Sequence, residues 1–340
     1  MTGGLLRRFV RRSTRFPGFR PRTGRRFLTV RMDTTNRCNL RCSMCPMRLS
    51  DGDPDRRWTD MDAGLFDRIV RQVFPIARTV GLSCGAEPFC NSDFPHYLEA
   101  LYRADVPVRE VVTNGTLMGE AEMDALVRTP PTSLFISIDG ASRETHSKIR
   151  GGADLEGILD SVRLLVRKRD LASGRFPMVS FSMTLQKSNL EELPEVVRTA
   201  AEVGARSVGV VPLVPYEGLG VADQVLDMAS GEVGSVMERS GRIARELGVE
   251  LVTAHPESRS GGACAYPHGW LFIDPEGRVD PCPYWDTSRP LGDLSRQSFG
   301  EIWRGEAYEG LRRSLARGEL TGNCSICPVM SSGSDELKKT

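Results

Sequence analysis

The chain has 340 residues, of which 40% are hydrophobic and 26% are charged, and its net charge is +1. This length suits one large and one small domain, because single hydrophobic cores stop growing near about 250–300 residues. The near-zero charge lacks the basic signature of a nucleic-acid-binding protein. No apolar run approaches the ~18–20 residues that a membrane-spanning helix requires. We therefore expect a cytoplasmic protein with no nucleic-acid or membrane partner.

The first 26 residues contain nine arginines and no acidic residue. No apolar segment of signal-peptide length follows the Arg-Arg pairs, which argues against secretion. We predict a basic N-terminal arm over residues 1–26 that lies on the domain or contacts an acidic electron donor. Nine cysteines without a signal peptide favour metal ligation in a reducing cytoplasm over disulfides.

Three cysteines, Cys38, Cys42 and Cys45, follow the first strand-like segment with the spacing C-x3-C-x2-C. A [4Fe–4S] cluster usually takes four thiolates, so three leave one iron open for another ligand. The alternative is a structural zinc site, but zinc usually has four protein ligands and no fourth Cys or His follows nearby. The spacing therefore favours an iron–sulfur cluster with one open iron.

Six strand-like segments alternate with helical patterns between residues 27 and 212. Several are apolar throughout, as parallel strands buried on both faces should be. This alternation predicts an α/β fold with a partial (β/α)6 TIM-type barrel, whose chemistry collects at the C-terminal strand ends. The six segments are Phe27–Asp33, Thr79–Cys84, Arg109–Thr113, Ser133–Asp139, Met178–Thr184 and Arg206–Pro212.

The cysteine loop resembles the signature of radical S-adenosylmethionine (SAM) enzymes. Residues 84–88 (Cys-Gly-Ala-Glu-Pro) are similar to the family's Gly-Gly-Glu-Pro motif, with alanine in place of one glycine. Residues 113–115 and 137–140 also match family motifs at strand ends. The resemblance implies that SAM binds the open iron, with Met44 at the adenine. The other implied SAM contacts are Gly85, Ala86, Glu87, Asn114, Ser137, Arg150 and Ser182; the alternative for Arg150 is a structural ion pair.

Residues 213–260 lose the strand–helix rhythm, and we predict a helical connection there. A small α+β module over residues 261–330 follows, with a hairpin signal in residues 270–279 and a tail over residues 331–340. Its cysteines resemble those of the Twitch domain, the shortened relative of the SPASM domain. The resemblance implies a second, auxiliary [4Fe–4S] cluster, with zinc as the alternative. The implied ligands are Cys264, Cys282, Cys324 and Cys327. Two cysteines remain, Cys84, expected to be a buried small residue, and Cys90.

The resemblance implies an enzyme that forms a 5′-deoxyadenosyl radical and abstracts hydrogen from a small molecule, with an external donor such as flavodoxin or ferredoxin. The second cysteine spacing is similar to that of dehydrogenases acting on 2-deoxy-scyllo-inosamine in aminoglycoside biosynthesis. It implies oxidation of an alcohol to a ketone in a sugar, aminocyclitol or nucleoside. Redox-neutral decarboxylation or epimerisation, peptide maturation and a non-enzymatic metal scaffold are the alternatives. The general base is not assigned; Arg206, Tyr216 and Glu217 are candidates.

Overall fold

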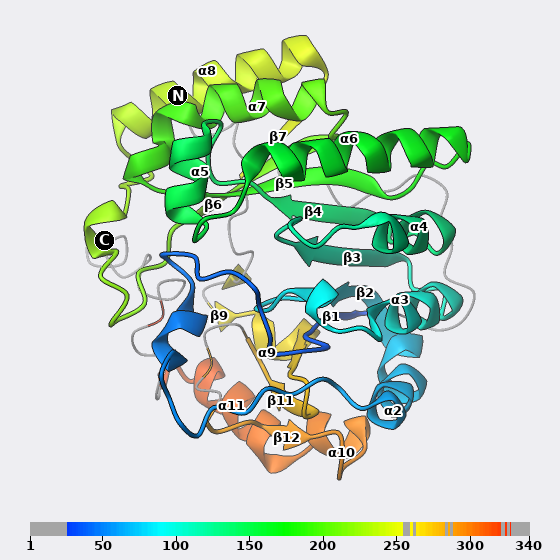
Figure 1. Ribbon diagram of the computed structural model, residues 1–340. Helices are drawn as coiled ribbons and strands as arrows, with labels where there is room; N and C mark the ends of the chain where they lie inside the picture. The colour runs from blue at the N-terminus through cyan, green and yellow to red at the C-terminus, as the bar shows by residue number, and fades with distance from the viewer. Residues whose placement is uncertain are drawn as a thin grey trace.

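The computed structural model describes residues 26–253, 259–260, 263–282, 285, 288–320, 324 and 327. The predicted tail and all but the last residue of the predicted basic arm lie outside the described residues. The described part has the predicted α/β architecture, built on a ten-stranded sheet with the order β12-β11-β10-β1-β2-β3-β4-β5-β6-β7. The sheet stays open, because β12 and β7 form its two edges (Figure 1).

Seven strands, β1 to β7, run parallel to one another in sequence order. Apolar helical stripes pack on the outer face of these strands (Figure 1). The strands are β1 (Leu28–Met32), β2 (Ala77–Leu82), β3 (Val108–Thr113), β4 (Ser133–Ser137), β5 (Met178–Leu185), β6 (Ser207–Pro212) and β7 (Glu250–Thr253). The helices are α2 (Ala63–Val73), α3 (Phe94–Arg103), α4 (Glu120–Arg128), α5 (Arg143–Ile149), α6 (Leu155–Leu171), α7 (Leu193–Glu202) and α8 (Gly231–Leu247).

The parallel strands alternate in character, which corrects the expectation of strands that are apolar throughout. In β5, Val179, Phe181 and Met183 are fully buried against the helices. The intervening Ser180 and Ser182 line a cavity on the inner face. Successive side chains of a strand point to opposite faces, so the outer face forms the core while the inner face is polar.

The region after β6 differs from the predicted helical connection. It contains α8, as expected, but also a seventh parallel strand, β7, which pairs with β6. Before α8 this region forms only a short 3-10 turn, Ala222–Gln224. The partial barrel therefore has one strand more than the six predicted from the sequence.

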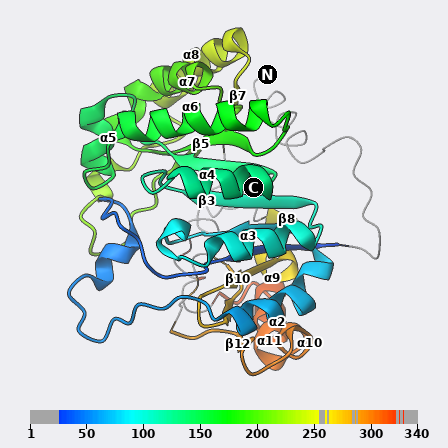
Figure 2. The same ribbon diagram turned by 45° about the vertical axis from the view of Figure 1, so that its right-hand side comes forward.

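The C-terminal module continues the sheet at the edge of β1 (Figure 2). Strand β10 pairs with β1 in parallel, and β11 and β12 follow antiparallel. The module comprises β8 (Arg259–Ser260), β9 (Ala263–Cys264), α9 (Tyr266–Gly269), β10 (Trp270–Ile273), β11 (Arg278–Asp280), β12 (Gly292–Asp293), α10 (Phe299–Trp303) and α11 (Glu306–Ala316). Among the described residues, no helix is both long and apolar enough to cross a membrane.

Candidate active site

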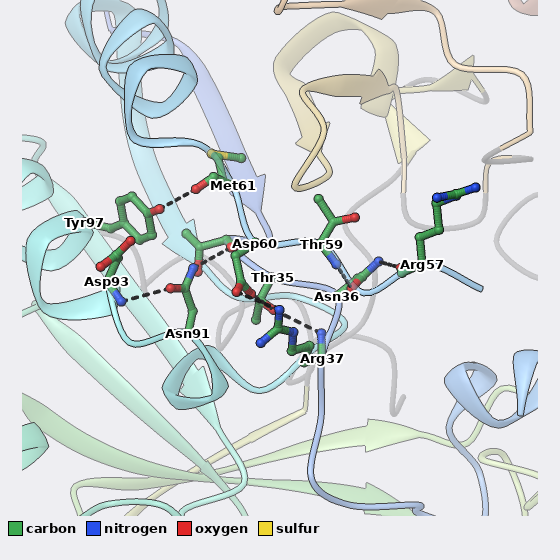
Figure 3. A network of polar contacts seen from close by, with 11 residues as sticks. Thr35, Asn36, Arg37, Arg57, Thr59, Asp60, Met61, Asn91, Asp93 and Tyr97 are labelled. Carbon is green, nitrogen blue, oxygen red and sulfur yellow. Dashed lines mark hydrogen bonds and ion pairs between the residues drawn. The ribbon is translucent and has the colours of Figure 1, made fainter. Parts of the chain in front are cut away.

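The cysteine loop leaves the C-terminal end of β1, where the βα loops of a parallel barrel carry the chemistry. A network of polar contacts fixes the entrance to this loop (Figure 3). The Thr35 hydroxyl donates to Asp60 over 2.7 Å, and Arg37 forms an ion pair with the same carboxylate at 3.0 Å. The Asn36 carboxamide oxygen accepts from the backbone N–H of Thr59 at 2.8 Å. The loop entrance is therefore tied to the segment that leads into α2.

The three thiols of this loop lie close enough to influence one another. Cys42 is buried, and Cys38 and Cys45 are partly exposed. Burial, together with the neighbouring Cys45 and Cys38, raises the pKa of Cys42 to about 11, and Arg150 opposes the shift. Such thiols ionise on binding a cationic centre, because thiolates are the metal-ligating form.

Among the residues that the structure describes, no three Cys, His, Asp or Glu side chains are placed to hold a single metal ion. The assignment of Cys38, Cys42 and Cys45 as ligands of an iron–sulfur cluster stays a prediction.

The middle of the cysteine loop rests on the turn after α5. The Ser43 N–H donates to the carbonyl of Ile149 over 2.8 Å. Gly151 has a φ of +61°, and a Cβ placed on it would lie 2.8 Å from the backbone carbonyl carbon and oxygen of Arg41. Glycine is required there on both counts, since L-residues disfavour this conformation and a methyl group would strike the loop backbone.

Glu87 is the buried anchor of the neighbouring strand ends. Its carboxylate accepts from the hydroxyl of Thr113 and the N–H of Asn114, both at 2.7 Å. Burial raises the pKa of Glu87 to about 7, although these hydrogen bonds oppose the shift. Both carboxylate oxygens are thus engaged by protein groups, which ties the turn after β2 to the turn after β3.

Asn114 reaches from this turn to the cysteine loop. Its Nδ2 lies 3.9 Å from Cys38 Sγ and 2.9 Å from the side-chain oxygen of Asn39. The Thr116 hydroxyl donates to Asn114 Oδ1 at 2.6 Å. Asn114 therefore orients the first cysteine from the end of β3.

The turn after β2 presents backbone groups at the barrel mouth. Ser83 has a φ of +78°, a conformation uncommon for residues other than glycine. The Ser83 hydroxyl donates to the carbonyl of Ala86 over 2.6 Å, and Asp33 accepts from the N–H groups of Cys84 and Gly85. The turn is thus held in shape by Ser83 and Asp33, the residues directly after β2 and β1.

Arg150 forms a buried ion pair with Asp139, with Nε and Oδ2 2.5 Å apart. The second oxygen of Asp139 accepts from the N–H of Thr184 at 2.6 Å. Burial opposes the charged form of Arg150, but Asp139 outweighs it, and Cys42 adds to the effect, so its pKa is raised. The ion pair considered from the sequence exists, and a SAM contact by Arg150 stays a prediction.

The remaining predicted SAM contacts lie on both sides of the mouth. Met44 is buried in a small apolar cluster with Ile149, Leu213 and Val221. Ser137 and Ser182 pair in register on β4 and β5, and Ser182 lines the cavity. No local pattern indicated that Leu213 and Val221 would pack against Cys42 and Met44 of the cysteine loop.

A cavity of about 1390 Å³ runs along the inner face of the sheet. We call it the barrel cavity. Ser83 and Cys84 line it at the mouth, and Arg206 and Glu250 line it at the opposite ends of the strands. Between them the cavity is lined by Arg31, Glu110, Phe135, Thr79 and hydroxyls of Ser133, Ser180, Ser182 and Ser207. An organic molecule in this cavity would lie directly beneath the mouth.

The second cysteine set is gathered in the C-terminal module. Burial raises the pKa of Cys264, and the nearby Cys327 raises it further. Cys324 lies within electrostatic reach of both Cys264 and Cys327. Cys282 follows β11 and influences the pKa of Tyr216 and Tyr308.

Tyr216 lies within electrostatic reach of thiols from both cysteine sets. Burial raises the pKa of its phenol, and the nearby thiols Cys84, Cys45 and Cys282 raise it further. The segment after β6 therefore adjoins the cysteine loop, the barrel mouth and the C-terminal module.

The two leftover cysteines both lie at the barrel mouth. Cys84 is exposed and lines the barrel cavity, so its expectation as a buried residue was wrong. It is exposed because the turn at Ser83 ends β2 directly before it. Burial raises the pKa of Cys90 to about 11, and the backbone N–H of Asn39 in the cysteine loop opposes the shift.

Comparison with curated proteins gives relatives over most of the chain. An AdoMet-dependent heme synthase of Methanosarcina barkeri is 29% identical over 325 residues, covering 88% of this chain and 87% of the relative. A PqqA peptide cyclase of Granulibacter bethesdensis is 22% identical over 284 residues, covering 80% of this chain and 72% of the relative.

Two solved structures share the fold. SuiB of Streptococcus suis bound to S-adenosylmethionine matches with a TM-score of 0.68 at 14% identity, covering 90% of this chain and 72% of that chain. BtrN in complex with AdoMet and 2-DOIA matches with a TM-score of 0.50 at 13% identity, covering 89% and 92%.

Family models cover the regions that carry the two cysteine sets. Residues 32–200 match the radical SAM superfamily, and residues 264–328 match SPASM, an iron–sulfur cluster-binding domain. These domains take SAM with a [4Fe–4S] cluster and an auxiliary iron–sulfur cluster, respectively. The chain therefore belongs to the radical SAM superfamily of enzymes and carries a C-terminal SPASM-type domain.

Proposed function

We propose that Cys38, Cys42 and Cys45 hold the [4Fe–4S] cluster and that SAM completes its coordination. When bound and reduced, this centre supplies a 5′-deoxyadenosyl radical that removes hydrogen from an unactivated C–H bond. The observation that carries the proposal is the grouping of these thiols in the loop after β1. The Glu87 N–H donates to the Arg37 carbonyl and so ties this loop to the turn after β2, whose Cys84 lines the barrel cavity. The protein's part is orientation and exclusion of water. An external donor such as flavodoxin or ferredoxin would supply the electron.

The residues proposed to contact SAM fall into two groups. Some are free to bind the cofactor, and others already form hydrogen bonds within the protein. The backbone of Gly85 and Ala86 and the side chain of Met44 are proposed to contact SAM directly, with Ser137 and Ser182 on the opposite side. Glu87 and Asn114 are engaged with strand ends and with the cysteine loop. Their proposed contribution is therefore to hold the motif in shape as well as to meet the cofactor. Arg150 would add positive charge beside Cys42.

We propose that Cys264, Cys282, Cys324 and Cys327 bind the auxiliary cluster, which would take up the electron released when the substrate radical is oxidised. The grouping of Cys264, Cys324 and Cys327 supports this assignment. Tyr216, which lies within electrostatic reach of both Cys45 and Cys282, supports a substrate site near both sets.

For the net reaction we propose oxidation of an alcohol to a ketone in a polar small molecule such as a sugar, aminocyclitol or nucleoside. The row of hydroxyls on the inner face supports a substrate rich in hydrogen-bonding groups. A radical decarboxylation is the second candidate, favoured by the excess of arginines over carboxylates among the residues that line the cavity. Peptide maturation is the third, favoured by the relative that is a peptide cyclase.

Anaerobic reconstitution tests the proposed function. The wild type should bind about eight iron ions, as expected for two [4Fe–4S] clusters, and should cleave SAM to 5′-deoxyadenosine when a reductant is added. Cys42→Ala should lose about half of the iron and all SAM cleavage. Cys324→Ala should lose a similar amount of iron but retain SAM cleavage. A fully loaded wild type that forms no 5′-deoxyadenosine would refute the assignment.

A further inference from the structure

One ion pair lies across the inner face of the sheet, just below the turn after β2. Arg31 of β1 pairs in register with Gly81 of β2, and Gly81 pairs with Glu110 of β3. The Arg31 guanidinium donates to the Glu110 carboxylate, two strands away. A Cβ on Gly81 would overlap the guanidinium, so glycine lets the arginine lie flat across β2.

Arg31 remains a cation with hydrogen-bonding capacity to spare. Its side chain is 23% exposed and that of Glu110 is 15% exposed, and both line the barrel cavity. Burial lowers the pKa of Arg31, but the Glu110 carboxylate outweighs it and the pKa is raised. A guanidinium has five N–H donors, and within the described ranges Glu110 is its one hydrogen-bond acceptor. Donors are therefore available to a molecule in the cavity.

The charge around the cavity favours an anion. Besides Arg31 and Glu110, the ionisable lining groups are Arg26, Arg78, Arg169, Arg175, Arg206, Asp170 and Glu250. Six arginines face three carboxylates, although the whole chain carries a charge of only +1. This excess of positive charge raises the local concentration of anions in the cavity.

We propose that the barrel cavity takes a carboxylate-bearing substrate and that Arg31 holds one of its carboxylates below the turn after β2. The planar guanidinium matches a carboxylate with two parallel hydrogen bonds. Glu110 keeps the arginine extended across Gly81, and the serine hydroxyls receive the polar remainder of the molecule. This inference rests on the proposed function and narrows its substrate class to acids. A polyol that carries an amine would instead bind through its ammonium group to the Glu110 carboxylate.

The test measures binding without turnover. Glutarate is titrated into the cluster-loaded protein at constant ionic strength, without reductant, and binding is followed by calorimetry. Arg31→Met should weaken glutarate binding about tenfold, the loss of one charge-assisted contact of about 1.4 kcal/mol. Glu110→Gln should retain or tighten binding, because the guanidinium is then free of its carboxylate. Arg31→Lys should fall between the wild type and Arg31→Met.

Arg31→Met and Glu110→Gln control for each other, because each removes one partner of the Arg31–Glu110 ion pair. A structural defect would weaken glutarate binding in both, whereas an anion site predicts weaker binding in Arg31→Met and unchanged or tighter binding in Glu110→Gln. Equal weakening in both variants, no glutarate binding by the wild type, or selective binding of putrescine would overturn the proposal. SAM cleavage is measured separately on the same preparation. A protein that cleaves SAM yet fails the glutarate test refutes this inference and leaves the radical assignment standing.

Discussion

Gly151 and Gly152 offer a matched test of how the cysteine loop is held. Both have positive φ angles, +61° and +90°. A Cβ on Gly151 would lie 2.8 Å from the backbone of Arg41, whereas a Cβ on Gly152 would meet nothing within 4 Å. Alanine at either position therefore carries backbone strain, and only Gly151→Ala also strikes the loop between Cys38 and Cys42.

The magnitude follows from these two contributions. A left-handed conformation costs a residue with a Cβ roughly 1–2 kcal/mol, and overpacking against a fixed neighbour adds about 1–3 kcal/mol. Gly152→Ala should thus lower the free energy of unfolding by roughly 1–2 kcal/mol, and Gly151→Ala by about 2–5 kcal/mol. Gly151→Ala should also bind less iron at the first site, because displacement of Arg41 moves the adjacent thiols.

Urea unfolding of the cluster-free protein measures the stability difference, and iron content with visible absorption after reconstitution measures cluster binding. Cys264→Ala is introduced beside each glycine variant to remove the auxiliary cluster, so that the remaining iron reports the first site. Equal stability and equal iron in Gly151→Ala and Gly152→Ala would show that the contact with Arg41 does not position the loop.

Three further predictions concern the surrounding site. Burial raises the pKa of Glu87 from 4.5 to about 7, so the folded protein is more stable when Glu87 is protonated. This contribution to the free energy of unfolding is up to about 3 kcal/mol. It is fully present below pH 4.5 and is lost as the pH rises through about 7. Glu87→Gln should flatten that part of the urea-midpoint profile, and an unchanged slope would contradict it. Asp139→Asn leaves the Arg150 cation buried without its carboxylate and should cost about 3–5 kcal/mol of unfolding free energy, whereas Asp160→Asn, at an exposed pair with Arg163, should cost under about 1 kcal/mol; similar losses would argue against a buried pair. Gly81→Ala should displace the Arg31 side chain and weaken glutarate binding as Arg31→Met does, while Gly209→Ala, whose Cβ would have its nearest neighbour at 3.6 Å, serves as the folding control.

The six main parallel strands could be predicted from the sequence because the residues on their outer faces are apolar and belong to one hydrophobic core. The seventh could not, since β7 has four residues, Glu250–Thr253, none of them fully buried. The polar inner face was also missed. Its signal was present in Ser180 and Ser182, which alternate with apolar residues as a one-sided strand requires.

The thiols of the site were readable from local spacing, because three of them lie within eight residues. The Arg31–Glu110 ion pair could not be predicted from the sequence. Its two residues are 79 positions apart and meet only through the register of three strands. The position of Cys84 depended on the backbone of Ser83, a non-glycine residue with φ +78°. Side chains that meet through tertiary register leave no local pattern in a single sequence.

The pairing of β10 with β1 has a consequence for how the two halves of this enzyme can vary. The four-residue register from Thr29–Trp270 to Met32–Ile273 joins the halves as one hydrogen-bonded body. The separation of the two cysteine sets is thus set by strand alignment, and linker length has little influence on it. Removing the C-terminal module would uncover a strand edge, which promotes aggregation. An exchange of this module between relatives should therefore conserve the β10 alignment before any loop.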